Sequence, residues 1–233
     1  MNVYIWTSGE LKNAYIGEYI PRNWLLWYRP LQSDLKDASW NWKDWSWYSG
    51  TGSFGTVGSK KWAICTLTSD GSNSLSTQHV ITSLNYSWPT LTICWWEYIN
   101  TLNSASWNWI LTNSSSATSY ISLSPRPWQS NKWSIWWNWN ILTVNSAPST
   151  WTRYFVVWVL TSSWKKIYVN WNLAGSDSTW FTTWQWSIWR LWCWQIIQNS
   201  TYYWWLNWYV RHCAVYNREL TADEVLQFYN NTN

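Results

Sequence analysis

Charge, glycine and long apolar runs are all scarce in this chain. Only 11% of its 233 residues are charged, and the formal net charge is +4. No basic cluster alternates with helix signals, so nucleic-acid binding is not expected. Because no run approaches the roughly 18 apolar residues of a membrane span, we expect none. Positions 1–10 lack a secretory signal. The chain is therefore either a fragment or a protein that leaves the cell by another route, and we expect it outside the cell, on a cell surface or in a virion.

Cysteine and histidine are also few, which limits metal and nucleophile chemistry. No pair of the four cysteines has zinc-ligand spacing, and each lies in an apolar, strand-like run: Cys65, Cys94, Cys193 and Cys213. We expect four buried thiols, with one disulfide as the alternative. His79 and His212 are the only histidines, and no acid or nucleophile lies at a sequence spacing from either that indicates a catalytic site.

Tryptophan is as abundant as glycine is rare, with 31 Trp against 8 Gly. Six Trp directly follow Asn: Trp24, Trp42, Trp109, Trp139, Trp171 and Trp208. Asn-Gly is the typical type I′ hairpin turn, and a bulky residue is an outlier at the positive φ that this turn requires. Asn170-Trp171 stands between two strand-like segments, 166–169 and 172–174.

Two explanations of these tryptophans remain open. One is recoding, in which UGA codons that the natural host reads as Gly have been translated as Trp. The other is a genuine Trp-rich surface that stacks on sugar rings. Trp96, within a strand-like run, and Trp151, before another, fit their places as real tryptophans.

The β-branched and aromatic runs predict an all-β chain of roughly a dozen short strands. Residues 1–22 stand apart as an arm or linker with one or two short strands around Ser8-Gly9, and residues 32–58 are predicted to be a long loop region. The predicted strands are 24–28, 63–68, 78–82, 91–99, 109–112, 119–123, 134–137, 140–144, 153–160, 187–197 and 209–216.

The last predicted strand leads into one well-specified helix. Thr221 and Glu224 have capping-box spacing, and Leu220 and Val225 have hydrophobic-staple spacing. We expect this helix to run through Phe228 or Tyr229 and to end at Asn230-Asn231.

The segment from Tyr209 to Val225, with its Tyr-Asn-Arg-Glu-Leu-Thr turn, resembles the end of laminin-G-type domains of the concanavalin A-like superfamily. Two other stretches are similar to that family: 25–44, with its Asp- and Ser-containing loop, and the 165–175 hairpin after Trp151. The resemblance implies a two-sheet antiparallel jelly-roll β-sandwich over 23–233 with a short C-terminal helix. It also implies binding of carbohydrate or a protein surface.

Catalysis is not expected. Retaining glycoside hydrolysis needs two carboxylates about 5 Å apart, and the superfamily's Glu-x-Asp-x-x-Glu strand motif is absent, since Glu97 is alone on its strand. We predict a non-catalytic recognition or adhesion module that requires no cofactor. A structural virion or cell-surface component is the alternative, with self-association through residues 1–22, and a polysaccharide hydrolase is third.

One loop is rich in oxygen ligands of the kind that calcium prefers. These residues are Asp34, Asp37, Asn41 and Asp44. The alternative is that they form Asx-turns, which such sequences often do.

Overall fold

The structure is a computed structural model of the whole chain. It describes the backbone of residues 2–7, 10–15, 20–21, 24–30, 46–49, 53–66, 78–80, 86–87, 90–100, 109–112, 120–126, 131–137, 140–178, 187–188, 190–193, 197–198, 201–202 and 207–233. Side chains are described for residues 20–21, 24–26, 28, 30, 54–63, 90–100, 123, 131–135, 141–178 and 209–233.

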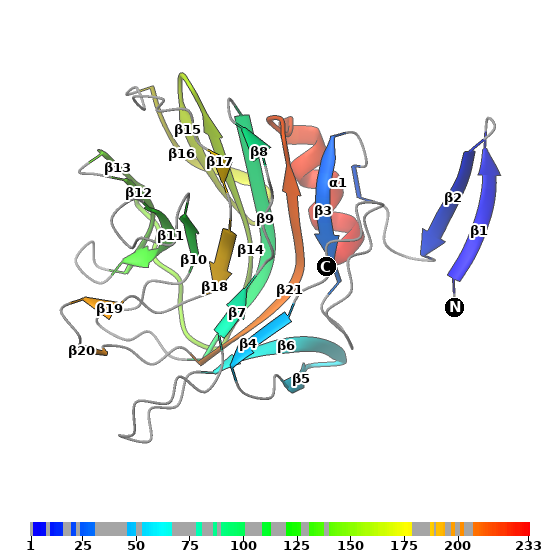
Figure 1. The fold of residues 1–233 in the computed structure, drawn as a ribbon, viewed down its shortest axis with the longest axis horizontal. Helices are drawn as coiled ribbons and strands as arrows, with labels where there is room; N and C mark the ends of the chain where they lie inside the picture. The colour runs from blue at the N-terminus through cyan, green and yellow to red at the C-terminus, as the bar shows by residue number, and fades with distance from the viewer. Residues whose placement is uncertain are drawn as a thin grey trace.

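Two antiparallel sheets face each other, as Figure 1 shows, which confirms the predicted all-β sandwich. The large sheet has the order β16 (Asn172–Asp177), β15 (Lys165–Val169), β14 (Thr152–Thr161), β9 (Thr90–Ile99), β21 (Asn207–Tyr216), β6 (Lys60–Thr66) and β5 (Ser53–Val57), and β3 (Leu25–Arg29) also pairs with β21. The second sheet has the order β13 (Asn140–Thr143), β12 (Lys132–Trp137), β11 (Tyr120–Arg126), β10 (Trp109–Thr112), β18 (Arg190–Cys193), β7 (Gln78–Val80) and β4 (Ser46–Ser49).

Three short strand pairs complete the β-structure. They are β1 (Asn2–Thr7) with β2 (Glu10–Tyr15), β8 (Tyr86–Ser87) with β17 (Ser187–Ile188), and β19 (Ile197–Gln198) with β20 (Thr201–Tyr202). Strands β1 and β2 confirm the two predicted short strands and pair from Asn2–Tyr15 to Thr7–Glu10, and the pair stands apart from the sandwich in Figure 1.

Strand β9 lies inside the large sheet, between β14 and β21, and is buried on both faces. Its alternate residues Leu91, Ile93 and Trp95 point into the space between the sheets, where they pack with residues such as Trp133 and Trp158. Residues of the other parity, Cys94 and Trp96, face outward into a second apolar cluster. A strand with two buried faces lacks the polar alternation of a half-exposed one, as the sequence of β9 shows.

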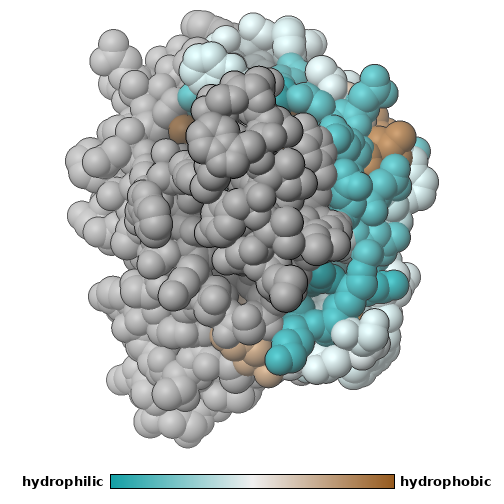
Figure 2. All heavy atoms as spheres, turned by 90° about the vertical axis from the view of Figure 1, so that its right-hand side faces the viewer, coloured by the Kyte–Doolittle hydropathy of each residue, from teal (hydrophilic) through white to brown (hydrophobic). Residues whose placement is uncertain are grey.

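Helix α1 (Ala222–Thr232) supplies the cover for the outer face of the large sheet. Its start is fixed by the predicted capping box: the Thr221 hydroxyl accepts from the Glu224 amide, and the Glu224 carboxylate accepts from the Thr221 amide. Leu220 and Val225, the two staple residues, are both fully buried. The helix therefore adds a third layer over the sheet, and this side of the molecule is largely hydrophilic where its residues are described (Figure 2).

Charged pairs tie the start of α1 to the sheet. Arg218 donates to both carboxylate oxygens of Glu224 at 2.6 Å, a bidentate pair. Glu219 accepts from Lys166 at 2.5 Å and from the Trp164 indole N–H at 3.0 Å, which joins the β14–β15 turn to the strand–helix connection.

The Asn170-Trp171 turn joins β15 to β16 as predicted. Asn170 has φ 47° and Trp171 φ 64°, so both central residues have the positive φ that a type I′ turn requires. Trp24 and Trp151 also have positive φ, 61° and 60°. Trp151, which its place before a strand marked as a genuine tryptophan, thus has a backbone conformation that glycine adopts more easily. Trp96, by contrast, is an extended and buried strand residue.

Two local expectations were wrong, and the closing strand has one feature that was not predicted. Residues 32–58 are not all loop, because β4 and β5 lie within them, and β5 turns into β6 at Gly58, whose φ is 61°. Helix α1 does not end at Asn230-Asn231 but continues to Thr232, with Asn233 as its C-cap. The closing strand carries a bulge, at which His212 has φ 51°. No helix among the described residues is long and apolar enough to cross a membrane.

Replacing Trp24 with Gly should raise the free energy of unfolding by about 1 kcal/mol. The left-handed backbone is strained for a bulky residue, and the Trp24 side chain is 69% exposed, so little burial is lost. Trp164→Gly is the matched control, since Trp164 is exposed, is not among the positive-φ residues and donates to Glu219. We expect urea unfolding to show a higher free energy of unfolding for Trp24→Gly and a lower one for Trp164→Gly. Equal losses in both would contradict this account of the turn.

Candidate binding surface

Helix α1 leaves one end of the large sheet's outer face uncovered. There the pairing places Arg153 of β14, Tyr98 of β9 and Tyr209 of β21 directly opposite one another. We call these three residues the aromatic row. Arg153 is exposed, and the two tyrosines are partly exposed. The row is thus an accessible strip across three neighbouring strands.

The rings of the row lie in mutual contact. The Tyr98 and Tyr209 ring centroids are 5.9 Å apart in an edge-to-face arrangement. The Trp151 ring lies outside the row as defined, at its edge, 6.4 Å from the Tyr98 ring, and Trp151 is 66% exposed. Edge-to-face rings at this separation stabilise one another, so the row is a preorganised surface rather than a set of loose side chains.

The next outward-facing position along the same three strands is buried. There Phe155, Trp96 and Arg211 stand opposite one another, and all three are buried. The Trp96 indole donates to the Thr232 hydroxyl at 2.7 Å, and its ring stacks on Tyr229 at 5.1 Å. The last turn of α1 therefore forms the border of the aromatic row.

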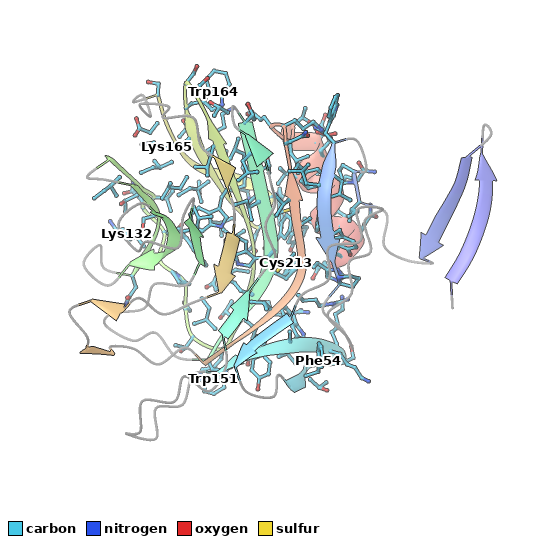
Figure 3. The ribbon with its side chains drawn as sticks, in the orientation of Figure 1. Phe54, Lys132, Trp151, Trp164, Lys165 and Cys213 are labelled. Carbon is cyan, nitrogen blue, oxygen red and sulfur yellow. The ribbon has the colours of Figure 1, made fainter. Side chains whose placement is uncertain are left out.

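A polar rim lies on the other side of the row. Residues 144–151 connect β13 to β14 and are exposed apart from Val144 and Pro148. The Ser149 amide donates to the Tyr154 hydroxyl at 2.7 Å, and the Thr152 hydroxyl donates to the Thr150 carbonyl at 3.2 Å. Trp151 marks this end in Figure 3, far from Trp164 at the other end of β14. The row thus presents aromatic rings and a cation beside a polar loop.

Glu97 lies on β9 next to Tyr98 but points into the space between the sheets, where it is fully buried. One carboxylate oxygen accepts from the Trp95 indole at 3.1 Å, and the other has no hydrogen-bond partner. Burial raises its pKa to about 8, and the Trp95 bond opposes that rise. A neutral carboxyl sealed in the core cannot reach a substrate, so Glu97 is a structural residue here.

His212 is also structural. It sits in the β21 bulge, is fully buried, and its Nδ1 lies 2.7 Å from the Tyr28 hydroxyl. Burial, and then the charge of Arg211, hold the pKa of the imidazole well below its usual value. This agrees with the expectation of a packed strand histidine.

The predicted calcium residues Asp34, Asp37, Asn41 and Asp44 lie outside the described residues, as does the His79 side chain. Within the described part, no group of three or more acidic, histidine or cysteine side chains could hold a metal ion. Cys94 and Cys213 are buried thiols that do not form disulfides, as predicted, and burial raises the pKa of Cys94 well above its usual value.

The residues of the aromatic row were not predicted from the sequence as a site. Tyr98, Arg153 and Tyr209 are far apart along the chain, and their neighbourhood depends on the strand register. The sequence indicates them only weakly. Each lies at or near the end of a predicted strand and alternates with the residues that face inward.

No protein-family model and no curated protein sequence matches this chain. Solved structures do. Domain 4 of AbnA, a GH43 extracellular arabinanase of Geobacillus stearothermophilus in complex with arabinotriose, has a TM-score of 0.68 at 13% identity over 88% of this chain and 98% of that one.

Two larger proteins are also similar. A structure of botulinum neurotoxin type C, whose cell entry depends on interaction with two ganglioside molecules, has a TM-score of 0.68 at 14% identity, over 91% of this chain and 52% of that one. A Trypanosoma rangeli sialidase has a TM-score of 0.64 at 14% identity, over 90% of this chain and 33% of that one. This chain therefore spans about half of the first and a third of the second. These likenesses show the β-sandwich fold, and the laminin-G type stays a prediction.

Glu97→Gln should flatten the pH dependence of stability. A folded pKa raised from 4.5 to about 8 means that folding favours the protonated acid. Stability from this group is therefore full below pH 4.5 and is lost as pH rises to 8, at roughly 1 kcal/mol per pH unit.

The matched control is Glu224→Gln, because the Arg218 bond lowers the Glu224 pKa and its stability is lost as pH falls. The measurement is thermal unfolding between pH 5 and 9. At high pH the Glu97 variant should be more stable than the parent protein, and the Glu224 variant should be less stable. Unchanged pH slopes for Glu97→Gln would contradict the burial argument.

Proposed function

We propose that this protein is a non-catalytic recognition module that binds glycans at the aromatic row. The observation that supports this most strongly is the accessible strip of Arg153, Tyr98 and Tyr209 on a rigid sheet, next to a polar loop. Aromatic rings offer an apolar face to the C–H side of a sugar, while nearby polar groups fix its orientation. Strands hold such groups more firmly than mobile loops do.

The fold supports the same proposal. One similar structure is in complex with arabinotriose, and another is of a toxin whose cell entry depends on interaction with two ganglioside molecules. Fold alone does not fix a ligand, so the aromatic row carries the proposal and the comparisons are consistent with it. Among the described residues, no carboxylate pair of the kind that hydrolysis needs is present near the row, since Glu97 faces the core.

A protein partner is the second candidate function. A similar botulinum neurotoxin DC binding domain is in complex with rat synaptotagmin II. The β1–β2 hairpin favours this alternative, because an isolated two-stranded hairpin is marginally stable and has open edges that another chain can pair with. In that reading residues 1–22 are an arm for self-association, as in a structural virion component.

Tyr98→Ala should weaken glycan binding at least tenfold, because it removes the central ring of the row. Trp164→Ala is the matched control, since it removes an exposed aromatic ring at the opposite end of the sandwich (Figure 3). The measurement is binding to an immobilised glycan array, with both variants checked for folding by circular dichroism. Binding to no sugar, or equal loss in both variants, would overturn the proposal.

We also propose that glycine is the natural residue at Trp24, Trp151 and Trp171. All three have positive φ and exposed side chains, and two of them follow Asn. Glycine adopts this backbone without strain, whereas a bulky residue costs on the order of 1–3 kcal/mol. The support concerns these three turns and does not extend to Trp96, which is buried in a strand.

Peptide mass spectrometry of the protein isolated from its natural source tests this proposal. We expect glycine in the peptides that contain positions 24, 151 and 171, and tryptophan at position 96. Tryptophan at all three turns would overturn the recoding proposal and would leave a strained but genuine Trp-rich surface.

A further inference from the structure

We infer that the aromatic row selects sugars that carry a carboxylate, with Arg153 as the residue that recognises the acid. This inference rests on the proposed glycan binding and adds the chemical class of the ligand. It depends on the ionic partners of the described charged residues and on the position of Arg153 in the row.

The guanidinium of Arg153 is an exposed cation without an ion pair or hydrogen bond among the described residues. Three partly buried carboxylates are already paired with other cations: Asp177 pairs with Lys165 at 2.8 Å, Glu219 with Lys166, and Glu224 with Arg218. Asp223 lies in the first turn of α1, whereas the last turn borders the row. The charge of Arg153 is thus left to solvent or to a ligand.

Arg153 also lies where a stacked sugar would present its substituents. It stands directly opposite Tyr98, and Tyr209 stands on the far side of Tyr98. With neighbouring strands about 4.8 Å apart, Arg153 and Tyr209 are separated by roughly 10 Å across β9. A short oligosaccharide on the two rings therefore places one of its ends at the guanidinium.

The chemistry of the side chain favours a carboxylate there. Arginine presents a planar fork of N–H donors that matches the two oxygens of a carboxylate, and it stays charged at all ordinary pH values. Beside aromatic surface, such a charge-assisted pair is less hydrated than in open water and is worth more. Neutral sugars would gain the stacking contacts alone.

The test compares sugars that differ only in the acid: sialyllactose with lactose, and an oligogalacturonate with its methyl ester. We expect the acidic member of at least one pair to bind tenfold or more tightly at low salt, with the preference shrinking as salt is raised. Arg153→Gln should abolish the preference. A sulfated lactose distinguishes recognition of a carboxylate from recognition of any anion.

Lys61→Gln is the matched control, because it removes the same charge from an exposed residue of β6, two strands beyond β9. It should leave the preference intact. Equal binding of acidic and neutral members, equal effects of Arg153→Gln and Lys61→Gln, or tighter binding of the sulfated sugar would overturn this inference while glycan binding stands. Binding to no sugar at all would overturn the proposed function as well.

Discussion

The structure depends on the burial of strand β9 on both of its faces. Inward, its side chains close the space between the sheets, and outward they need the cover of α1. Because an apolar outer face cannot be left in water, the chain must return after β21 and lay one helix across it. The cap at Thr221 and the Arg218–Glu224 pair fix where that helix starts. Its length then decides how much of the outer face stays open.

The part of the outer face beyond the end of α1 holds the proposed binding surface. The helix ends beside Trp96, and the next position along β9 is Tyr98, the centre of the aromatic row. Consecutive residues of β9 therefore have opposite environments, because Glu97 is buried between the sheets while Tyr98 is partly exposed on the outer face. The same geometry that excludes Glu97 from chemistry presents an aromatic strip with one cation.

The sequence predicted what local patterns encode. The capping box, the staple and the Asn170-Trp171 turn were found at their residues, because each depends on neighbours along the chain. The strands β4 and β5 were missed, since polar and glycine residues interrupt their apolar pattern. The His212 bulge and the aromatic row could not be predicted, because both depend on how distant strands pair. The row is a product of register, which local sequence does not state.

Locating the bound saccharide on the protein tests the central claim most directly. Backbone amide shifts measured by NMR during titration with the tightest-binding sugar would map the contact residue by residue. We expect the largest changes at Tyr98, Arg153 and Tyr209, with the first turn of α1 unchanged. Changes concentrated at residues 31–45, or at the start of α1, with the row unaffected, would contradict it.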